Sequence, residues 1–116
     1  EAETMCKHNE YGSACEVYRH ILHHDADNVP ALCNYGIVLE RVYQDESAAI
    51  SKFEAALRND PNDVTCLMHY ARATYRATGA MRNARMLLHR AVSLDPTNQS
   101  ANTNLALLYL AENMHA

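Results

Sequence analysis

Histidine and cysteine side chains are the first candidates for chemistry in this chain of 116 residues, which has seven histidines and four cysteines. Three histidines, His20, His23 and His24, are clustered, and two of them share one face of a helix. A zinc site needs three or four converging ligands, and only Asp25 and Asp27 are close enough in sequence to complete one. Because the helix dipole also favours histidines near a helix end, we interpret the cluster as structural and expect no bound metal.

The cysteines are Cys6, Cys15, Cys33 and Cys66, and no two of them form a Cys-x-x-Cys pair. Zinc ribbons and redox motifs depend on such close pairs, so neither kind of site is supported. We expect free, buried thiols in a reducing compartment, and therefore an intracellular, cytoplasmic location.

Catalytic and phosphate-binding motifs are missing from the sequence. It has no Ser-His-Asp order, no phosphate-binding loop and no paired carboxylates in a defined pocket, so we expect no enzyme and no cofactor. No apolar run approaches the roughly 18 residues of a membrane helix, and no leader resembles a signal peptide. A composition of 48% hydrophobic and 21% charged residues is ordinary for a soluble globular domain.

The charge is distributed unevenly along the chain. The net charge is −4, which makes a general attraction to nucleic acid unfavourable. Residues 1–60 carry a net −6, whereas residues 61–96 carry a net +3 that comes from five arginines and two aspartates. The basic stretch is where we expect an acidic partner to dock.

The sequence contains an internal repeat with a period of 35 residues. Residues 56–63 read ALRNDPND, residues 91–98 read AVSLDPTN, and residues 21–28 read ILHHDADN, a weaker copy. Matched positions at the same spacing are Ala14, Ala49 and Ala84; Tyr18, Phe53 and Leu88; Leu22, Leu57 and Val92; and Gly36, Ala71 and Ala106. A fixed period of this length indicates a repeat array, with small residues that let helices approach and bulky ones that fill the space between them.

Apolar residues at helical spacing predict about seven helices and no strand. The expected ranges are 1–8, 12–24, 29–43, 46–59, 63–78, 81–93 and 98–112, and a turn at 9–12 separates the first two. The polar residues expected to cap helix starts are Asn28, Asp45 and Asp63. Gly79 is placed to end a helix in a left-handed turn, and Gly36 in mid-helix indicates close approach of another helix.

With these positions in place, the chain resembles a tetratricopeptide repeat array. One copy of the family pattern is Leu32, Tyr35, Gly36, Leu39, Ala49, Phe53, Ala56 and Pro61; the next is Leu67, Tyr70, Ala71, Thr74, Ala84, Leu88, Ala91 and Pro96. The resemblance implies an all-α, right-handed superhelical solenoid of antiparallel helix hairpins. Residues 1–25 are then a partial repeat, 26–60 and 61–95 are full repeats, and 96–116 hold the first helix of a further one. The period exceeds the family norm by one residue, which implies a longer first helix or turn in each hairpin.

In this family the first helix of each hairpin lines a concave groove. The resemblance implies that the peptide-binding residues are Asn34, Ile37, Arg41, His69, Arg72, Arg76 and Asn104, flanked by Cys33, Met68, Thr103 and Leu107. Asn34, His69 and Asn104 are 35 residues apart and should form a line of polar rungs for a peptide backbone. The arginines, expected to be exposed, suit carboxylates, so we expect a non-catalytic scaffold that binds an extended, acidic protein or peptide segment.

Three other functions fit the sequence less well. The 35-residue period also suits pentatricopeptide repeats that bind RNA, although an acidic chain suits RNA poorly. A targeting or regulatory domain of a larger enzyme is a further alternative. The carboxylate clamp that some members use for chaperone tails matches only at Asn34, because Thr65 and His69 stand where basic residues are needed, so chaperone docking is disfavoured.

The last helix, Asn98–Glu112, has apolar residues on more than one face, at Leu105, Leu107, Leu108, Tyr109 and Leu110. In a complete repeat a following helix would cover part of this surface. We therefore expect either a longer natural chain that continues the stack or self-association through this helix.

Overall fold

The structure is a computed structural model that describes the backbone of residues 2–115 and the side chains of residues 12–114. Its helices are α1 (Ala2–His24), α2 (Val29–Arg41), α3 (Glu46–Asn59), α4 (Val64–Thr78), α5 (Met81–Leu94) and α6 (Gln99–His115). The part of the chain that is described contains no strand. The predicted all-α architecture is confirmed.

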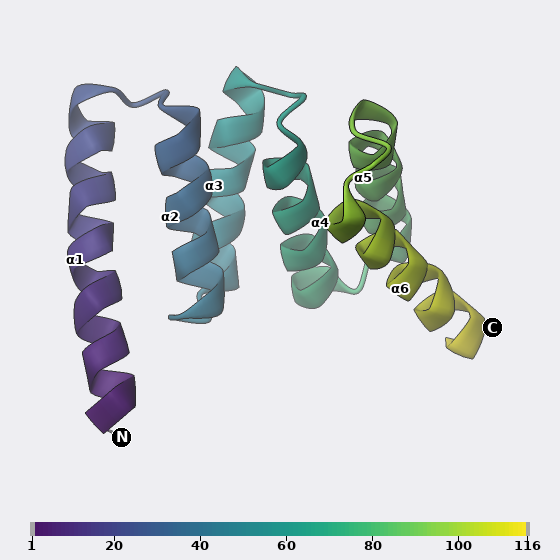
Figure 1. Cartoon of the computed structure of the whole chain (residues 1–116), viewed down its shortest axis with the longest axis horizontal. Coiled ribbons are helices and arrows are strands. Elements are labelled where there is room, and N and C mark those ends of the chain that lie inside the picture. Colours follow the sequence, from purple (N-terminus) through teal and green to yellow (C-terminus); the bar gives the residue numbers. More distant parts are fainter. Residues whose placement is uncertain (1, 116) are drawn as a thin grey trace.

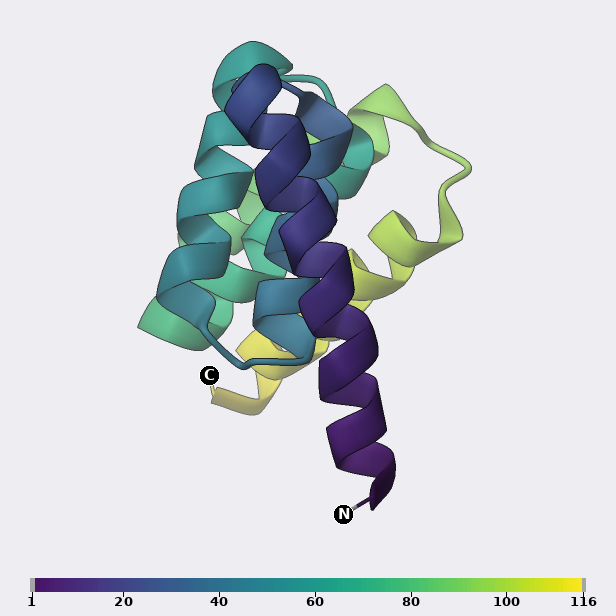
Figure 2. The ribbon, with the colours of Figure 1, turned by 90° about the vertical axis from the view of Figure 1, so that its left-hand side faces the viewer.

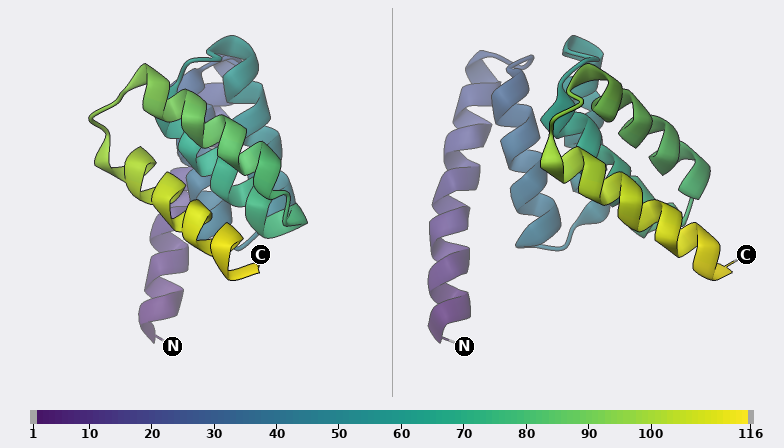
Figure 3. Two further views of the ribbon diagram at one scale, coloured as in Figure 1. Left: turned by 90° about the vertical axis from the view of Figure 1, so that its right-hand side faces the viewer. Right: turned by 45° about the vertical axis from the view of Figure 1, so that its right-hand side comes forward.

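The helices lie side by side in chain order, as Figure 1 shows from α1 at one end to α6 at the other. The pairs α2–α3 and α4–α5 are antiparallel hairpins, α1 lies along α2, and Figure 2 shows α1 crossing in front of them. Figure 3 shows α6 running alongside α5 at the other end, where Arg85 donates two hydrogen bonds of 2.8 and 2.9 Å to the Glu112 carboxylate. The expected solenoid of antiparallel hairpins is therefore present.

The turn expected at residues 9–12 is not formed, because α1 is one continuous helix through this stretch. The described chain thus has six helices where about seven were expected. Gly12 does not adopt a positive φ, unlike Gly79. A glycine inside a helix costs only about 1 kcal/mol relative to alanine, which a long helix with no proline tolerates.

The starts of α2, α4 and α6 repeat one local structure. The side chains of Asn28, Asp63 and Asn98 accept hydrogen bonds of 2.9–3.0 Å from the backbone N–H three residues later. Their own N–H groups donate to the carbonyls of Asp25, Asp60 and Asp95. Asp45 caps α3 in the same way, and Gly79 ends α4 with φ of 71°. The predicted caps and the predicted left-handed stop are confirmed.

The close approach predicted at Gly36 is also present. A Cβ atom at this position would lie 2.7 Å from Cε1 of Phe53, whose side chain is fully buried in α3. The matched small residue in the next hairpin, Ala71, is buried, but its counterpart in α6, Ala106, is exposed. The small position of α6 therefore has no helix packed over it among the described residues.

The outer surface of α6 is apolar but differs in one residue from the expectation. Leu107, Leu110 and Met114 are 57%, 59% and 84% exposed. Leu108 was expected on the open surface, yet it is buried at 6% exposure because it turns toward α4 and α5. Self-association through this helix stays a prediction. No helix within residues 2–115 is both long and apolar enough to span a membrane.

Candidate peptide-binding groove

Three adjoining hollows follow the face formed by α2, α4 and α6. The first, which we name the polar hollow, has a volume of about 540 Å³ and lies between all three helices. The second, the arginine hollow, has about 340 Å³ and lies between the C-terminal ends of α2 and α4. The third, the apolar hollow, has about 190 Å³ and lies between α4, α5 and α6. Arg72 lines all three, so they form one connected surface.

Six of the seven residues expected in the groove line these hollows. The polar hollow includes Ile37, Arg41, His69, Arg72 and Asn104, and the arginine hollow includes Arg41, Arg72 and Arg76. Asn34 is exposed on α2 and lines none of the three, so the line of polar rungs stays a prediction. Cys33, also expected on this face, is instead buried between α2 and its neighbours.

Arg72 was expected to be exposed, but it is partly buried and forms an ion pair. Its Nη2 donates to Oε1 of Glu40 at 3.1 Å, and the Glu40 side chain is fully buried while that of Arg72 is 31% exposed. The same nitrogen lies 2.8 Å from Nδ1 of His69. A buried carboxylate needs a partner, so Arg72 stabilises the fold as well as lining the groove. Arg76, by contrast, is exposed as expected.

Sequence reasoning did not find Glu40. One signal was available, because Glu40 follows Gly36 by four residues and therefore shares the buried face of α2. Glu40 Oε2 and Arg72 Nε are buried and have no hydrogen-bond partner among the described residues. One is an acceptor and the other a donor, so the pair has the groups for a second hydrogen bond that the structure does not form.

His69 is uncharged at neutral pH. Burial first, and then the charges of Arg72 and Arg41, lower the pKa of its imidazole from 6.5 to about 4. Because arginine is only a donor, Nδ1 of His69 must accept from Arg72, which places the proton on Nε2. The ring stacks on Phe53 with centroids 6.1 Å apart. His69 is therefore a neutral side chain in the wall of the polar hollow, with its proton on Nε2.

The groove is positively charged. Arg41 and Arg76 are exposed and form no ion pair within residues 12–114, whereas the charge of Arg72 is compensated by Glu40. Two uncompensated guanidinium groups thus border the arginine hollow. Planar guanidinium groups suit carboxylates and phosphates, which they bind with two parallel hydrogen bonds.

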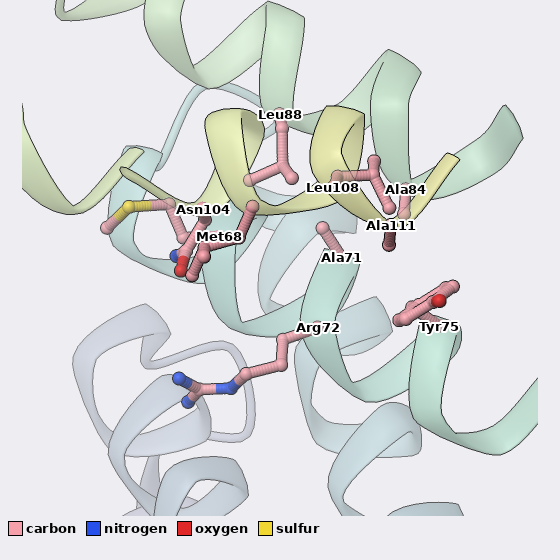
Figure 4. Close-up of a pocket in the computed structure, with 10 residues that line it drawn as sticks. Met68, Ala71, Arg72, Tyr75, Ala84, Leu88, Asn104, Leu108 and Ala111 are labelled. Atoms are coloured by element: carbon pink, nitrogen blue, oxygen red, sulfur yellow. The ribbon is translucent and has the colours of Figure 1, made fainter. Parts of the chain in front are cut away.

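The apolar hollow has a different character, as Figure 4 shows. Leu88 from α5 and Leu108 from α6 line it together with Ala71 and Tyr75 of α4. Met68, Arg72 and Asn104 line both this hollow and the polar hollow, so apolar and polar surfaces meet without a gap.

The histidine and cysteine candidates lie away from this groove or are buried. The rings of His20 and His24 contact edge to face, with centroids 4.7 Å apart. Among the described residues, no three His, Cys, Asp or Glu side chains are grouped so that they could hold a metal ion. Cys15, Cys33 and Cys66 are buried free thiols that form no disulfide with one another. The side chain of Cys6 lies outside the described residues. A hydrogen bond with Cys33 and burial raise the pKa of the Cys66 thiol, which therefore remains protonated.

Comparison with known proteins places the fold. No protein-family model and no curated protein sequence matches the chain. Solved structures do match. One is the second TPR domain of human RPAP3 in complex with the HSP70 peptide SGPTIEEVD. It superimposes with a TM-score of 0.76 at 20% sequence identity, and the match covers 89% of this chain and 84% of that one. The first TPR of Spaghetti (RPAP3), bound to the HSP90 peptide SRMEEVD, has a TM-score of 0.79 at 18% identity and covers 96% and 89%.

The crystal structure of MamA matches with a TM-score of 0.77 at 20% identity, over 94% of this chain and 64% of that one. The chain therefore has the tetratricopeptide-repeat fold that its sequence resembles. At these identities the likeness is one of fold.

Proposed function

We propose that this chain is a non-catalytic protein-interaction module whose groove along α2, α4 and α6 binds an extended, acidic segment of a partner protein. The observation that carries this proposal is the connected set of hollows that meet at Arg72 and carry two uncompensated cations, Arg41 and Arg76. An extended peptide presents its side chains to alternate pockets and its backbone groups between them.

Each part of the groove has a role in this proposal. Arg41 and Arg76 bind carboxylates of the partner. His69 donates from Nε2 to a peptide carbonyl, and Asn104 supplies both a donor and an acceptor to the peptide backbone. Arg72 positions His69 through their hydrogen bond and is itself held by Glu40. Ile37 contributes the apolar contact of the polar hollow.

The ligands of two similar structures support an acidic segment. The peptides in the RPAP3 complexes both end in Glu-Glu-Val-Asp. In this chain the residues expected for a terminal carboxylate clamp match only at Asn34, which lies outside the hollows. We therefore propose that side-chain carboxylates, rather than the free C-terminus of the partner, are recognised here.

Peptide binding measured by fluorescence anisotropy tests the proposal. The probes are SRMEEVD, the same peptide with a C-terminal amide, and a version in which both glutamates are glutamines. We expect the amide to leave the affinity nearly unchanged and the glutamine version to bind about tenfold more weakly. A large loss on amidation alone would indicate a terminal carboxylate clamp instead.

Protein variants locate the site. Arg41→Gln and Arg76→Gln should each weaken the acidic probe about three- to tenfold. Arg82→Gln is the matched control, because Arg82 is exposed on α5 and lines none of the three hollows. Equal effects of all three substitutions would mean that only general electrostatic attraction is measured, and the groove assignment would be abandoned.

A further inference from the structure

The arginine hollow carries more positive charge than one carboxylate can neutralise. It has a volume of about 340 Å³ and is lined by Glu40, Arg41, Gln44, Arg72 and Arg76. Glu40 and Arg72 form an ion pair with each other, which leaves a net charge of +2 from Arg41 and Arg76. Both of these arginines are exposed and form no ion pair within residues 12–114. Like charges at one hollow repel each other, so a ligand with about two negative charges offsets them best.

The geometry of an extended peptide limits how glutamates can supply these two charges. Successive side chains of an extended chain point to opposite sides. Of two adjacent glutamates, only one can therefore point into the arginine hollow. Its carboxylate has two oxygens, which a single guanidinium group already binds with two parallel hydrogen bonds. The second guanidinium group is then left without a partner.

A phosphorylated serine or threonine supplies what one carboxylate lacks. At pH 7 its phosphate group carries a charge of about −1.5 to −2 and has three acceptor oxygens. Two guanidinium groups can bind such a group together, because each arginine has five N–H donors and the phosphate has oxygens for both. The side-chain amide of Gln44 is a further donor among the lining residues. In Figure 4 the guanidinium of Arg72 points away from Leu88 and Leu108, and it compensates the one carboxylate that lines the hollow.

We propose that the arginine hollow binds a phosphorylated serine or threonine of the partner segment, in preference to a carboxylate, and that Arg41 and Arg76 hold the phosphate group jointly. This inference rests on the proposed function and names the residue that the groove selects. Nucleic acid also presents phosphates, but its binding depends on contacts to many of them. This chain has a net charge of −4, and only two uncompensated cations line the hollow. The recognised group is therefore a dianion on a single peptide side chain.

Four synthetic peptides test the preference by fluorescence anisotropy. They are nine-residue peptides of glycine and asparagine that differ only at the centre, which is phosphoserine, serine, a single glutamate, or Glu-Asn-Glu. The last peptide places two carboxylates on the same side of an extended chain. We expect phosphoserine to bind about tenfold or more tightly than the single glutamate and about threefold or more tightly than Glu-Asn-Glu. The serine peptide should bind most weakly.

Protein variants test whether both arginines hold one phosphate group. Arg41→Gln or Arg76→Gln should each reduce the preference for phosphoserine over the single glutamate to less than about threefold, because one guanidinium group serves either ligand. Arg82→Gln is the control and should retain the tenfold preference, since Arg82 is exposed on α5 and does not line the hollow. In the unaltered protein, the Nε–H NMR signals of Arg41 and Arg76 should both shift on addition of the phosphoserine peptide.

The outcomes separate this inference from the function on which it rests. Equal affinity for phosphoserine and Glu-Asn-Glu, with both above serine, overturns the phosphate site and leaves acidic-segment binding standing. A preference for phosphoserine that survives in both Arg41→Gln and Arg76→Gln also overturns it, as does inorganic phosphate or single-stranded RNA that competes as well as the phosphoserine peptide. If neither phosphoserine nor Glu-Asn-Glu binds more tightly than serine, the proposed function fails as well. If a variant loses its helical circular dichroism, the arginine NMR shifts decide the matter alone.

Discussion

Replacing Arg72 by methionine should destabilise the protein far more than the same change at Arg76. The substitution keeps most of the aliphatic stem but leaves the carboxylate of Glu40, whose side chain is fully buried, without the one charged partner it has among residues 12–114. Removing one member of a buried ion pair costs about 3–5 kcal/mol. Because the Arg72 side chain is 31% exposed, water can partly replace it, and we expect a loss of about 2–3 kcal/mol.

Urea unfolding followed by circular dichroism at 222 nm measures this loss. With a slope of about 1–3 kcal/mol per molar urea, the midpoint should fall by about 0.7–3 M while the slope stays constant. Arg76→Met is the control and should change stability by less than about 0.5 kcal/mol. The double variant Glu40→Leu with Arg72→Met removes both charges and should recover most of the stability. If Arg72→Met is as mild as Arg76→Met, the pair does not stabilise the fold and our account of Glu40 is incorrect.

Three further predictions concern titration, packing and association. The pKa of His69 is lowered to about 4 in the folded protein, from about 6.5 in the unfolded chain. Between pH 6.5 and pH 4 the unfolded chain therefore binds more protons than the folded protein, so the free energy of unfolding should fall by about 1–3 kcal/mol as the pH decreases over this range. His69→Gln should flatten this dependence in urea titrations from pH 7 to pH 4. Gly36→Ala should lower the free energy of unfolding by about 1–3 kcal/mol, because the new Cβ would collide with the buried ring of Phe53. Gly79→Ala should lower it by about 1 kcal/mol, because φ at this position is 71°. Both losses should appear as lower unfolding midpoints. Light scattering over a concentration series should show self-association that Leu110→Glu and Met114→Glu abolish without changing the melting temperature.

Each of these has a result that would contradict it. A His69 imidazole signal that titrates near pH 6.5 in NMR would show that the ring is not desolvated. Gly12→Ala is the packing control, because its new Cβ would have 3.6 Å to its nearest neighbour; it should be neutral or stabilising. If Gly36→Ala behaves in the same way, the contact with Phe53 is looser than described. A strict monomer at high concentration would rule out association through α6.

Much of the architecture follows from signals that act within a few residues. The caps at Asn28, Asp45 and Asp63 and the stop at Gly79 depend on one side chain or one backbone angle, and all were predicted correctly. Gly36 predicted the close approach of another helix, and in the structure Phe53 of α3 lies there. The exception, the expected turn at residues 9–12, shows the limit of such signals, because a single glycine opposes helix formation by only about 1 kcal/mol.

The face that each side chain takes was decided by tertiary packing. Successive residues of a helix point about 100° apart, so a small rotation of α2 or α6 moves a side chain between solvent and core. Cys33 and Leu108 were placed on the open surface for this reason, and both are buried. The pairing of Glu40 with Arg72, 32 residues apart, exists only because α2 and α4 lie against each other. The resemblance to tetratricopeptide repeats indicates which helices should line the groove, whereas the buried carboxylate of Glu40 depends on how those helices are rotated against their neighbours.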